Sequence, residues 1–451
     1  ACFLLAALTG LSAAERKPNI IFILADDLGY AELGSYGQKK IRTPHLDRLA
    51  KQGMSFTRNY SGNAVCAPSR CVLITGKHPG NAFIRNNGEV KPEGQRPIPD
   101  SEQTIAEGLR KRGYATGAFG KWGLGGPGTE GDPIYQGFDR FFGYNSQRHA
   151  HSYYPSYLWS NKVRVTLNNK PPVPGHASLP KGSNPKDPRS YDVFKGKDYA
   201  PDRINEQALK FIRANKNKPF FLFVSHECPH FPFQGPKDVK KEVNKTNWMK
   251  PDADTYVAML EDLDSEVGRL LSALEKHKLT NNTLVIFVSD NGGFAGAANM
   301  GPLNGAKSTT LEGGIRVPLI MRWPGQIRPD TTSHQVCSTF DLTRSILNLA
   351  QAKVPANRLD GLDIVNHIAA RKSDFARTLF WRGKRGERIW SAVRDGDLKY
   401  VCKTEGQTQE WLFDLSKDLA EKNDLSSVQP KQTARLKKLL ANWEKDVQSV
   451  R

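Results

Sequence analysis

The distribution of apolar residues predicts strands that are buried on both faces. Apolar runs of strand length lie within residues 19–24, 219–224 and 283–288, and a further strand is expected over 114–119. Half-exposed strands alternate apolar and polar residues, whereas strands covered on both sides carry continuous apolar runs. These runs therefore predict a sheet between two covering layers.

Helical patterns lie between these runs. Residues 43–53 carry the signals of a helix, with Thr43 at the N-cap, Pro44 at the first helical position and Gly53 after the last turn. Two further helices are predicted, over residues 104–112 and 254–274. The alternation of buried strands with helices predicts the α/β class, as a sandwich around a mainly parallel sheet.

The alternation breaks between residues 145 and 203. Tyr, Pro, Lys, Asn and Gly dominate there, with little periodicity. Long segments of this kind within a compact domain are more often functional than not. We therefore expect a long loop or insertion that contributes to function.

A second unit is predicted after residue 370. Its elements are expected to be a hairpin around residues 395–397, a strand over 411–415 and a closing amphipathic helix over 430–447. The chain is thus expected to consist of a catalytic domain over 15–370 and a smaller C-terminal α+β subdomain over 371–451.

The N-terminal segment is apolar and ends in small residues. Residues 1–14 resemble the apolar region and cleavage site of a secretory signal peptide, with Ser12 and Ala14 at the small positions. No Met and no basic stretch precede this run, so the signal peptide is expected to be incomplete. The run is too short for a transmembrane helix, and no integral membrane segment is expected in the mature chain. We expect an exported protein, periplasmic or extracellular.

Composition adds a strong positive charge. The chain has 65 Lys and Arg against 46 Asp and Glu, a formal net charge of +19. Such a surface attracts anionic partners. We find no nucleic-acid module and no interleaved aromatic and basic stripe, so nucleic acid is not expected as a partner. A sulfated polysaccharide would exploit the same field, and the charge also suits a role in solubility alone. Six cysteines do not indicate a disulfide-dense scaffold, and the sequence does not pair them.

Polar side chains with oxygen donors follow two of the buried strands. Asp26 and Asp27 come after the first strand, and Asp290 and Asn291 come after the strand over 283–288. Ligands of α/β sheets gather beyond the carboxyl ends of the strands. Carboxylate and amide oxygens suit Ca²⁺, whereas Zn²⁺ prefers thiolate and imidazole ligands. The sequence therefore predicts a calcium site at this edge.

A cysteine motif supplies the most specific signal. Residues 66–76 read C-x-P-x-R-x4-T-G, with Arg70 four residues after Cys66 and on the same face of a helix that starts there. Further matching segments lie at residues 25–29, 120–122, 229–232, 289–293 and 307–318. Together they resemble the type I, formylglycine-dependent sulfatases, an arylsulfatase family of the alkaline phosphatase superfamily.

The resemblance extends roughly from residue 17 to residue 425 and implies an alkaline-phosphatase-like fold. It also implies that a formylglycine-generating or sulfatase-maturing enzyme oxidises Cys66 to formylglycine. The hydrated aldehyde has two hydroxyls: one attacks sulfur to form a sulfo-enzyme, and the other then expels sulfate. An ordinary Ser or Cys lacks this second hydroxyl.

The resemblance further assigns roles to individual residues. The ligands of one Ca²⁺ would be Asp26, Asp27, Asp290, Asn291 and the oxygen of residue 66. Arg70 would hold the formylglycine hydroxyl and the metal-bound carboxylates. Lys121 and Lys307 would contact the sulfate and neutralise charge in the transition state. His230 would protonate the leaving oxygen.

One segment departs from the family pattern. The family has G-K-W-H-L-G where this chain has glycine at position 123. The missing histidine normally contacts the formylglycine and is a candidate base for its regeneration. His149 and His151 are therefore candidate substrate-binding residues, either as a replacement for that histidine or as part of a wall for the sugar, which we favour. The wall would also include Tyr153, Tyr154 and Trp159.

Residues 226–230 spell H-E-x-x-H, the string of zinc proteases. That motif requires a helix, so that both histidines share a face. Here it follows a strand and contains Pro229, which breaks a helix interior. A zinc protease is therefore not expected.

The sequence thus favours an exported sulfuric ester hydrolase that acts on a sulfated carbohydrate. One alternative is a phosphomonoesterase or phosphonate hydrolase of the same superfamily, which the fold alone does not exclude. The other is a catalytically silent relative that binds sulfated glycans through its basic face. The glycine at position 123 keeps this last alternative open.

Overall fold

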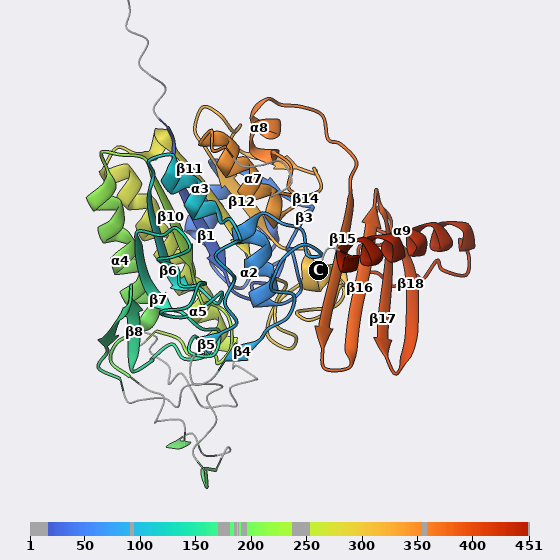
Figure 1. The fold of residues 1–451 in the computed structure, drawn as a ribbon, viewed down its shortest axis with the longest axis horizontal. Helices are drawn as coiled ribbons and strands as arrows, with labels where there is room; N and C mark the ends of the chain where they lie inside the picture. The colour runs from blue at the N-terminus through green and yellow to red at the C-terminus, as the bar shows by residue number, and fades with distance from the viewer. Residues whose placement is uncertain are drawn as a thin grey trace, which may run out of the picture.

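A ten-stranded mixed sheet runs through the larger part of the molecule (Figure 1). The computed structural model describes residues 17–90, 94–169, 181–184, 187, 189–190, 196–236, 253–353 and 359–449. The strands in spatial order are β13 (Thr331–Ser333), β2 (Met54–Phe56), β12 (Leu319–Arg322), β11 (Thr283–Ser289), β1 (Asn19–Ala25), β10 (Phe220–Ser225), β6 (Ala115–Lys121), β7 (Arg140–Tyr144), β8 (Tyr157–Ser160) and β9 (Val163–Thr166).

The centre of this sheet is parallel and its flanks are largely antiparallel. β11, β1, β10, β6 and β7 pair in parallel, one after the other. β12 and β8 join them antiparallel on either side. The predicted sandwich around a mainly parallel sheet is thus confirmed for the strands that carry the apolar runs. Their continuous burial explains why the sequence pattern identified them.

Helices cover both faces of the sheet. Alternate residues of β1 enter two separate cores: Ile20 and Phe22 face one layer, and Ile21 and Ile23 face the other. The first layer contains α2 (Cys66–Thr75), α3 (Ile105–Lys111), α7 (Thr339–Leu349) and α8 (Ile364–Ala369). The second contains α1 (Pro44–Lys51), α4 (Ala200–Asn215) and α5 (Ala253–Lys276).

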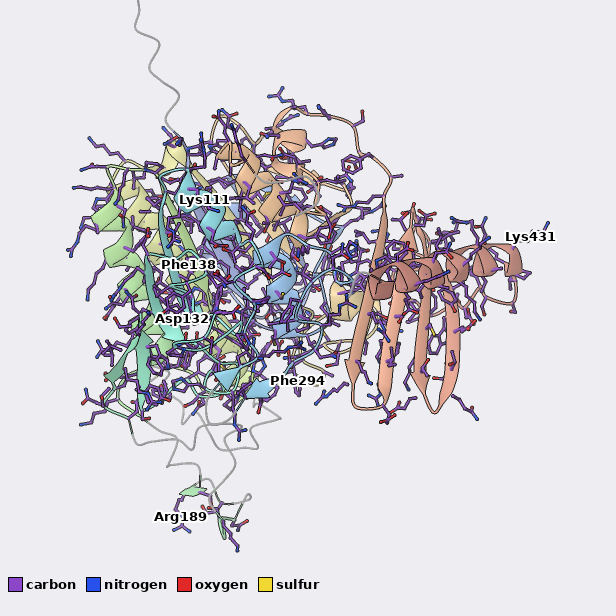
Figure 2. All side chains as sticks on the ribbon, in the orientation of Figure 1. Lys111, Asp132, Phe138, Arg189, Phe294 and Lys431 are labelled. Atoms are coloured by element: carbon purple, nitrogen blue, oxygen red, sulfur yellow. The ribbon has the colours of Figure 1, made fainter. Side chains whose placement is uncertain are left out.

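Aromatic side chains fill the space between sheet and helices (Figure 2). Phe138 is fully buried and stacks on Phe221 and Phe223 of β10, with ring centroids 6.1 and 6.3 Å apart. Lys431, by contrast, lies exposed near the start of the last helix. Burial of this many apolar side chains is the main stabilising contribution to such a fold.

The prediction of a long loop or insertion over residues 145–203 is wrong in two places, where the chain forms regular structure. β8 and β9 form a hairpin that extends the sheet beyond β7, and α4 begins at Ala200. The four residues of β9 are all exposed, so this edge strand lacks the apolar alternation by which a strand is recognised. Residues 170–180 and 191–195 lie outside the described residues.

A smaller unit forms the C-terminal part (Figure 1). It is an antiparallel sheet of β15 (Thr378–Arg385), β16 (Arg388–Asp395), β17 (Leu398–Glu405) and β18 (Gln407–Asp414), with α9 (Pro430–Ser449) packed across it. The predicted hairpin, late strand and closing helix all occur. The division of the chain at residues 370 and 371 stays a prediction; that position lies between α8 and β15.

Two further findings concern membrane-spanning helices and disulfides. In the part of the chain that the structure describes, no helix is long and apolar enough to cross a membrane. The five cysteines of these residues, Cys66, Cys71, Cys228, Cys337 and Cys402, are all free. The predicted signal segment, residues 1–14, lies outside the described residues.

A buried charge network joins the small sheet to the large domain. Lys399 of β17 is fully buried, and its Nζ donates to Glu312 Oε1 at 2.8 Å and to Glu421 Oε1 at 2.9 Å. Arg316 Nη1 donates to the other oxygen of Glu312 at 3.1 Å. Burial alone would raise the pKa of Glu312, but Lys399 and Arg316 outweigh it and lower the pKa to about 2. One lysine therefore holds two carboxylates from separate parts of the chain.

Replacing Lys399 by Met should destabilise the protein by about 3–5 kcal/mol, because the buried Glu421 loses the lysine that contacts it and the buried Glu312 loses one of its cationic partners. Since the pKa of Glu312 is about 2 in the fold and about 4.3 when unfolded, the ion pair stabilises above pH about 4.3 and this stabilisation is lost as the pH falls towards 2. The variant should lose less stability over that pH window. Urea unfolding at several pH values measures both effects.

Lys403→Met, on the same strand, is the matched control. Lys403 Nζ lies 3.0 Å from Glu405 Oε2 at a partly exposed position, so its loss should cost less than about 1 kcal/mol. Equal effects of the two substitutions would contradict the role given to Lys399.

Candidate active site

The carboxyl ends of β1 and β11 bring four polar side chains together. The two strands are parallel neighbours with Ala25 opposite Ser289, so the residues that follow them meet at one edge of the sheet. The backbone amide of Asp27 donates to Asp290 Oδ1 at 3.1 Å. Asn291 Nδ2 donates to Asp27 Oδ1 at 2.7 Å. Register alone thus assembles the oxygen donors that the sequence placed at strand ends.

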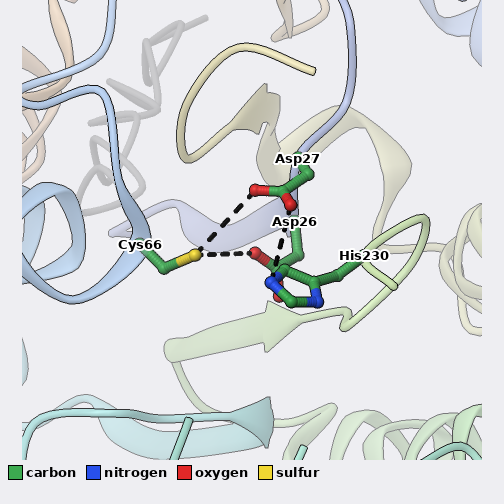
Figure 3. A group of neighbouring side chains, drawn as sticks. All are labelled: Asp26, Asp27, Cys66 and His230. Atoms are coloured by element: carbon green, nitrogen blue, oxygen red, sulfur yellow. Dashed lines mark hydrogen bonds and ion pairs between the residues drawn. The ribbon is translucent and has the colours of Figure 1, made fainter. Parts of the chain in front are cut away.

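The motif cysteine begins α2 and points into this cluster (Figure 3). Cys66 Sγ lies 3.4 Å from Asp26 Oδ1 and 3.9 Å from Asp27 Oδ1. The residue is only 1% exposed. Burial, and then the charge of Asp26, raise the pKa of the Cys66 thiol. The thiol is therefore protonated at neutral pH, which makes the unmodified cysteine a poor nucleophile.

Two lysines and a histidine surround the same carboxylates. Lys121 Nζ donates to Asp26 Oδ2. Lys307 Nζ lies 2.7 Å from Asp27 Oδ2 and 3.2 Å from Cys66 Sγ. His230 Nε2 lies 3.5 Å from Asp27 Oδ2, and burial together with the two lysines lowers the pKa of this imidazole. The cluster therefore presents several buried cationic groups around the position of residue 66.

Arg70 connects α2 to the ends of three strands. Its Nε and Nη2 lie 3.0 and 2.9 Å from Asp290 Oδ2. Its Nη1 donates to the Lys121 carbonyl oxygen at 2.7 Å and to Ser225 Oγ, at the ends of β6 and β10. Ser225, which also donates to the Lys121 carbonyl, carried no sequence signal because a serine at a strand end is unremarkable in isolation.

The donor set fits a hard divalent cation. Asn291 Oδ1 is buried and has no hydrogen-bond partner among the described residues. Burial and the charge of Asp26 raise the pKa of Asp290 to about 7, although Arg70 opposes this shift. A cation bound by oxygens would satisfy the amide oxygen and favour the ionised carboxylates.

The structure separates the two loop histidines. The ring of His151 stacks on His230, with centroids 4.7 Å apart and planes at 13°. His149 instead lies against Tyr144 and Tyr157, with centroids 5.1 and 4.5 Å away. His151 thus contacts His230, a member of the cluster in Figure 3, whereas His149 belongs to an aromatic group with Tyr144 and Tyr157. Their roles in substrate binding stay predictions.

Two members of the predicted sugar wall face the interior. Tyr153 is fully buried and its hydroxyl donates to the carbonyl oxygens of Glu227 and His230 at 2.7 and 2.9 Å. The Tyr154 hydroxyl donates to the Gly235 carbonyl oxygen at 2.9 Å. These tyrosines support the loop that carries His230 and are not available to a sugar. Trp159 on β8 is only partly buried.

The H-E-x-x-H segment is not helical, as expected. It follows β10 as an irregular loop. Glu227 is fully buried, and burial raises its pKa to about 8, so the carboxyl is largely neutral near pH 7. The segment serves to place His230 against the carboxylates.

Comparison with known proteins gives the family. Residues 18–352 match the sulfatase family profile, and residues 306–448 match the profile of the N-sulphoglucosamine sulphohydrolase C-terminal region. The chain belongs to the sulfatase family. It is 34% identical over 377 residues to N-acetylgalactosamine-6-sulfatase of Rattus norvegicus, and the aligned region covers 80% of this chain and 68% of the relative. It is 32% identical over 457 residues to human arylsulfatase A, which covers 94% of this chain and 86% of that enzyme.

Solved sulfatase structures share the fold. The crystal structure of Ps i-CgsB in complex with k-i-k-neocarrahexaose has a TM-score of 0.79 and 28% sequence identity, and covers 95% of this sulfatase and 93% of that chain. The alkaline-phosphatase-like architecture with a small C-terminal sheet is therefore confirmed, as is membership in a family of sulfate-ester hydrolases.

Replacing Arg70 by Lys should destabilise this sulfatase by about 2–3 kcal/mol, because the lysine keeps the charge but loses the fork that bonds three strand ends. Chemical denaturation measures the change. Arg110→Lys, at an exposed position of α3, is the control and should shift the free energy of unfolding by less than about 0.5 kcal/mol. A wild-type stability for Arg70→Lys would show that the fork does not hold the site together.

Proposed function

We propose that this sulfatase removes sulfate from a sulfated carbohydrate, with a formylglycine at position 66 and a bound Ca²⁺. The observation that carries the proposal is the buried cluster in which Cys66 lies between the carboxylates of Asp26 and Asp27 and the ammonium of Lys307. Relatives whose names or structures refer to N-acetylgalactosamine and to a neocarrahexaose support a sulfated sugar as the substrate class.

The state of Cys66 supports its modification. A buried thiol with a raised pKa and a neighbouring carboxylate is not an activated nucleophile. A hydrated formylglycine would supply a hydroxyl to attack sulfur and a second hydroxyl to expel sulfate afterwards. A formylglycine-generating or sulfatase-maturing enzyme is therefore the proposed partner in biosynthesis.

The surrounding residues have distinct tasks in this proposal. Lys121, at the end of β6, contacts Asp26, and Lys307 contacts Asp27. Both lysines would bind the sulfate oxygens, where their charge would offset the negative charge that develops in the transition state. His230 holds its Nδ1 against the Phe231 carbonyl oxygen, so its Nε2 is the atom that exchanges a proton with the leaving oxygen. Burial and the lysines lower the pKa of His230, so the neutral ring must first take up a proton at Nε2, which the negative charge of a bound sulfate would favour.

Asp26, Asp27, Asp290 and Asn291 would hold the Ca²⁺, as the oxygen-only side-chain donors and the unpartnered Asn291 Oδ1 favour. The ion would polarise a sulfate oxygen and lower the pKa of a hydroxyl on residue 66. Arg70 orients Asp290 through its two contacts to Oδ2 and so fixes one side of the ligand set.

Export is proposed on the sequence alone. The apolar residues 1–14 have the composition of a signal peptide and end in small residues. The basic net charge of +19 suits an enzyme that meets polyanionic carbohydrate outside the cytoplasm.

Cys66→Ala should abolish turnover and leave the protein folded, because only the nucleophile is lost. The assay uses 4-nitrophenyl sulfate, sulfated monosaccharides that include N-acetylgalactosamine 6-sulfate, and k-i-k-neocarrahexaose, with 4-nitrophenyl phosphate to detect a phosphatase. Intact and peptide mass spectrometry of protein from a maturing host should show formylglycine at position 66 and an N-terminus after residue 14.

Cys71→Ala, one turn farther along α2, should keep both formylglycine and turnover. Full activity with an unmodified Cys66 would contradict the proposed nucleophile. A preference for the phosphate ester would instead favour a phosphatase.

Removal of the metal should lower the melting temperature. Ca²⁺ at about 100 times its dissociation constant stabilises by about 2.7 kcal/mol, so chelation followed by Ca²⁺ addition should shift the transition by several degrees. Asn291→Leu should abolish most of this shift, whereas Asn348→Leu, at an exposed position of α7, should preserve it. No calcium-dependent shift in the wild type would rule out the site.

A further inference from the structure

A row of buried side-chain amides follows β7, beside the catalytic cluster. β7 pairs in parallel with β6, with Tyr144 opposite Lys121. The pairing continues past the strand ends, because Gly123 N donates to the Asn145 carbonyl oxygen at 3.0 Å. The residues after Tyr144 therefore lie alongside the segment whose Lys121 reaches Asp26.

The side chain of Gln147 occupies the space over Gly123. A Cβ added at Gly123 would lie 2.1 Å from Gln147 Nε2, and the backbone φ of +80° also disfavours any side chain at this position. Glycine at 123 thus admits the Gln147 amide to the strand end two residues beyond Lys121. Gln147 could not be identified from the sequence, since its contact with Gly123 joins two segments that are adjacent only in the fold.

A chain of hydrogen bonds through Gln95 and the segment at residues 87–88 links the Gln147 backbone to the start of α2. Gln147 N donates to Gln95 Oε1 at 3.3 Å, and Gln95 Nε2 donates to the Gly88 carbonyl oxygen at 2.7 Å. The preceding residue, Asn87, accepts from the backbone amide of Ala67 at 3.1 Å. On its other side the same loop continues to His151, which stacks on His230. Gln147 therefore lies between the α2 side and the His230 side of the site.

Three polar atoms of these buried amides have no partner within the described ranges of the chain. Asn145 is 2% exposed and Gln147 is 5% exposed. Both side-chain polar atoms of Asn145 and the Nε2 of Gln147 have no hydrogen-bond partner among the described residues. An unsatisfied buried polar group costs about 1–3 kcal/mol, so three such atoms at one strand end call for a partner other than the described residues.

The chemistry of the amides selects the ligand. In the proposed function the charged sulfate would be bound by Lys121, Lys307 and His230, which lie against Asp26 and Asp27. A primary amide is neutral and both donates and accepts, as a sugar hydroxyl does. We propose that the side-chain amides of Asn145 and Gln147 bind hydroxyl groups of the sugar that carries the sulfate. This inference rests on the proposed function, since it assigns the carbohydrate to a particular face of the same site.

The test compares a sugar sulfate with an ester that has no sugar hydroxyls. The variants are Gln147→Met and Asn145→Leu, which keep the volume and remove the hydrogen-bonding groups. The readout is a selectivity ratio: kcat/KM for the sulfated monosaccharide that the wild type hydrolyses fastest, divided by kcat/KM for 4-nitrophenyl sulfate. For each variant we expect this ratio to fall about tenfold or more, because the site has lost groups that bind sugar hydroxyls.

The melting temperature provides a second readout. It should fall if the amides have a structural role, and it should not fall if they bind substrate. Since three of these amide atoms have no partner in the described part of the chain, removing them should leave the melting temperature unchanged or raise it. Gln335→Met is the matched control: Gln335 is fully buried, and its amide bonds the backbone of Val336 and Phe375. That substitution should lower the melting temperature and leave the selectivity ratio unchanged.

The proposal is overturned by an unchanged ratio, as expected if ordered water alone satisfies the amides. It is also overturned if turnover of both esters falls equally, or if the variants lose as much stability as Gln335→Met. If the wild type hydrolyses 4-nitrophenyl sulfate but no sulfated sugar, the proposed carbohydrate subsite is refuted, whereas the sulfatase activity is not. A formylglycine-containing wild type that hydrolyses no sulfate ester would instead refute the proposed function.

Discussion

The structure depends on balancing three buried carboxylates at one sheet edge. Asp26, Asp27 and Asp290 are each no more than 1% exposed, and isolated ionised carboxylates at such depth would be strongly unfavourable. Arg70 and the two site lysines supply positive charge from separate elements. The position of α2, the register of β1 with β11 and the path of the loop that carries Lys307 are therefore linked to one another by electrostatics.

Much of the fold could be predicted because its central strands are buried on both faces. Continuous apolar runs located β1, β10 and β11, and capping residues located α1. The hairpin of β8 and β9 could not be predicted in this way, because β9 is an exposed edge strand and its residues meet no apolar layer. Its position is determined by pairing with β8 and β7, which the local sequence does not specify.

The polar cluster was predictable for a different reason. Asp26, Asp27, Asp290 and Asn291 follow strands that are themselves recognisable, and parallel strands present their carboxyl ends together. Cys66 was identified by its motif. Residues that act through tertiary contact were not predictable: Ser225 receives Arg70, and Gln147 covers Gly123. The split between His149 and His151 also required the course of the loop, which decides that only His151 stacks on His230.

Lys399 has a consequence for how such enzymes can change. The outer surface of the four-stranded C-terminal sheet can vary widely, since exposed substitutions cost little. The contact with Glu312 has less freedom, because Lys399 and Glu421 both belong to the module, and a module without this lysine leaves the buried Glu312 with Arg316 as its cation from the large domain. Replacement of this module would therefore have to preserve the charge balance at Glu312, a demand that the exposed positions of the sheet do not face.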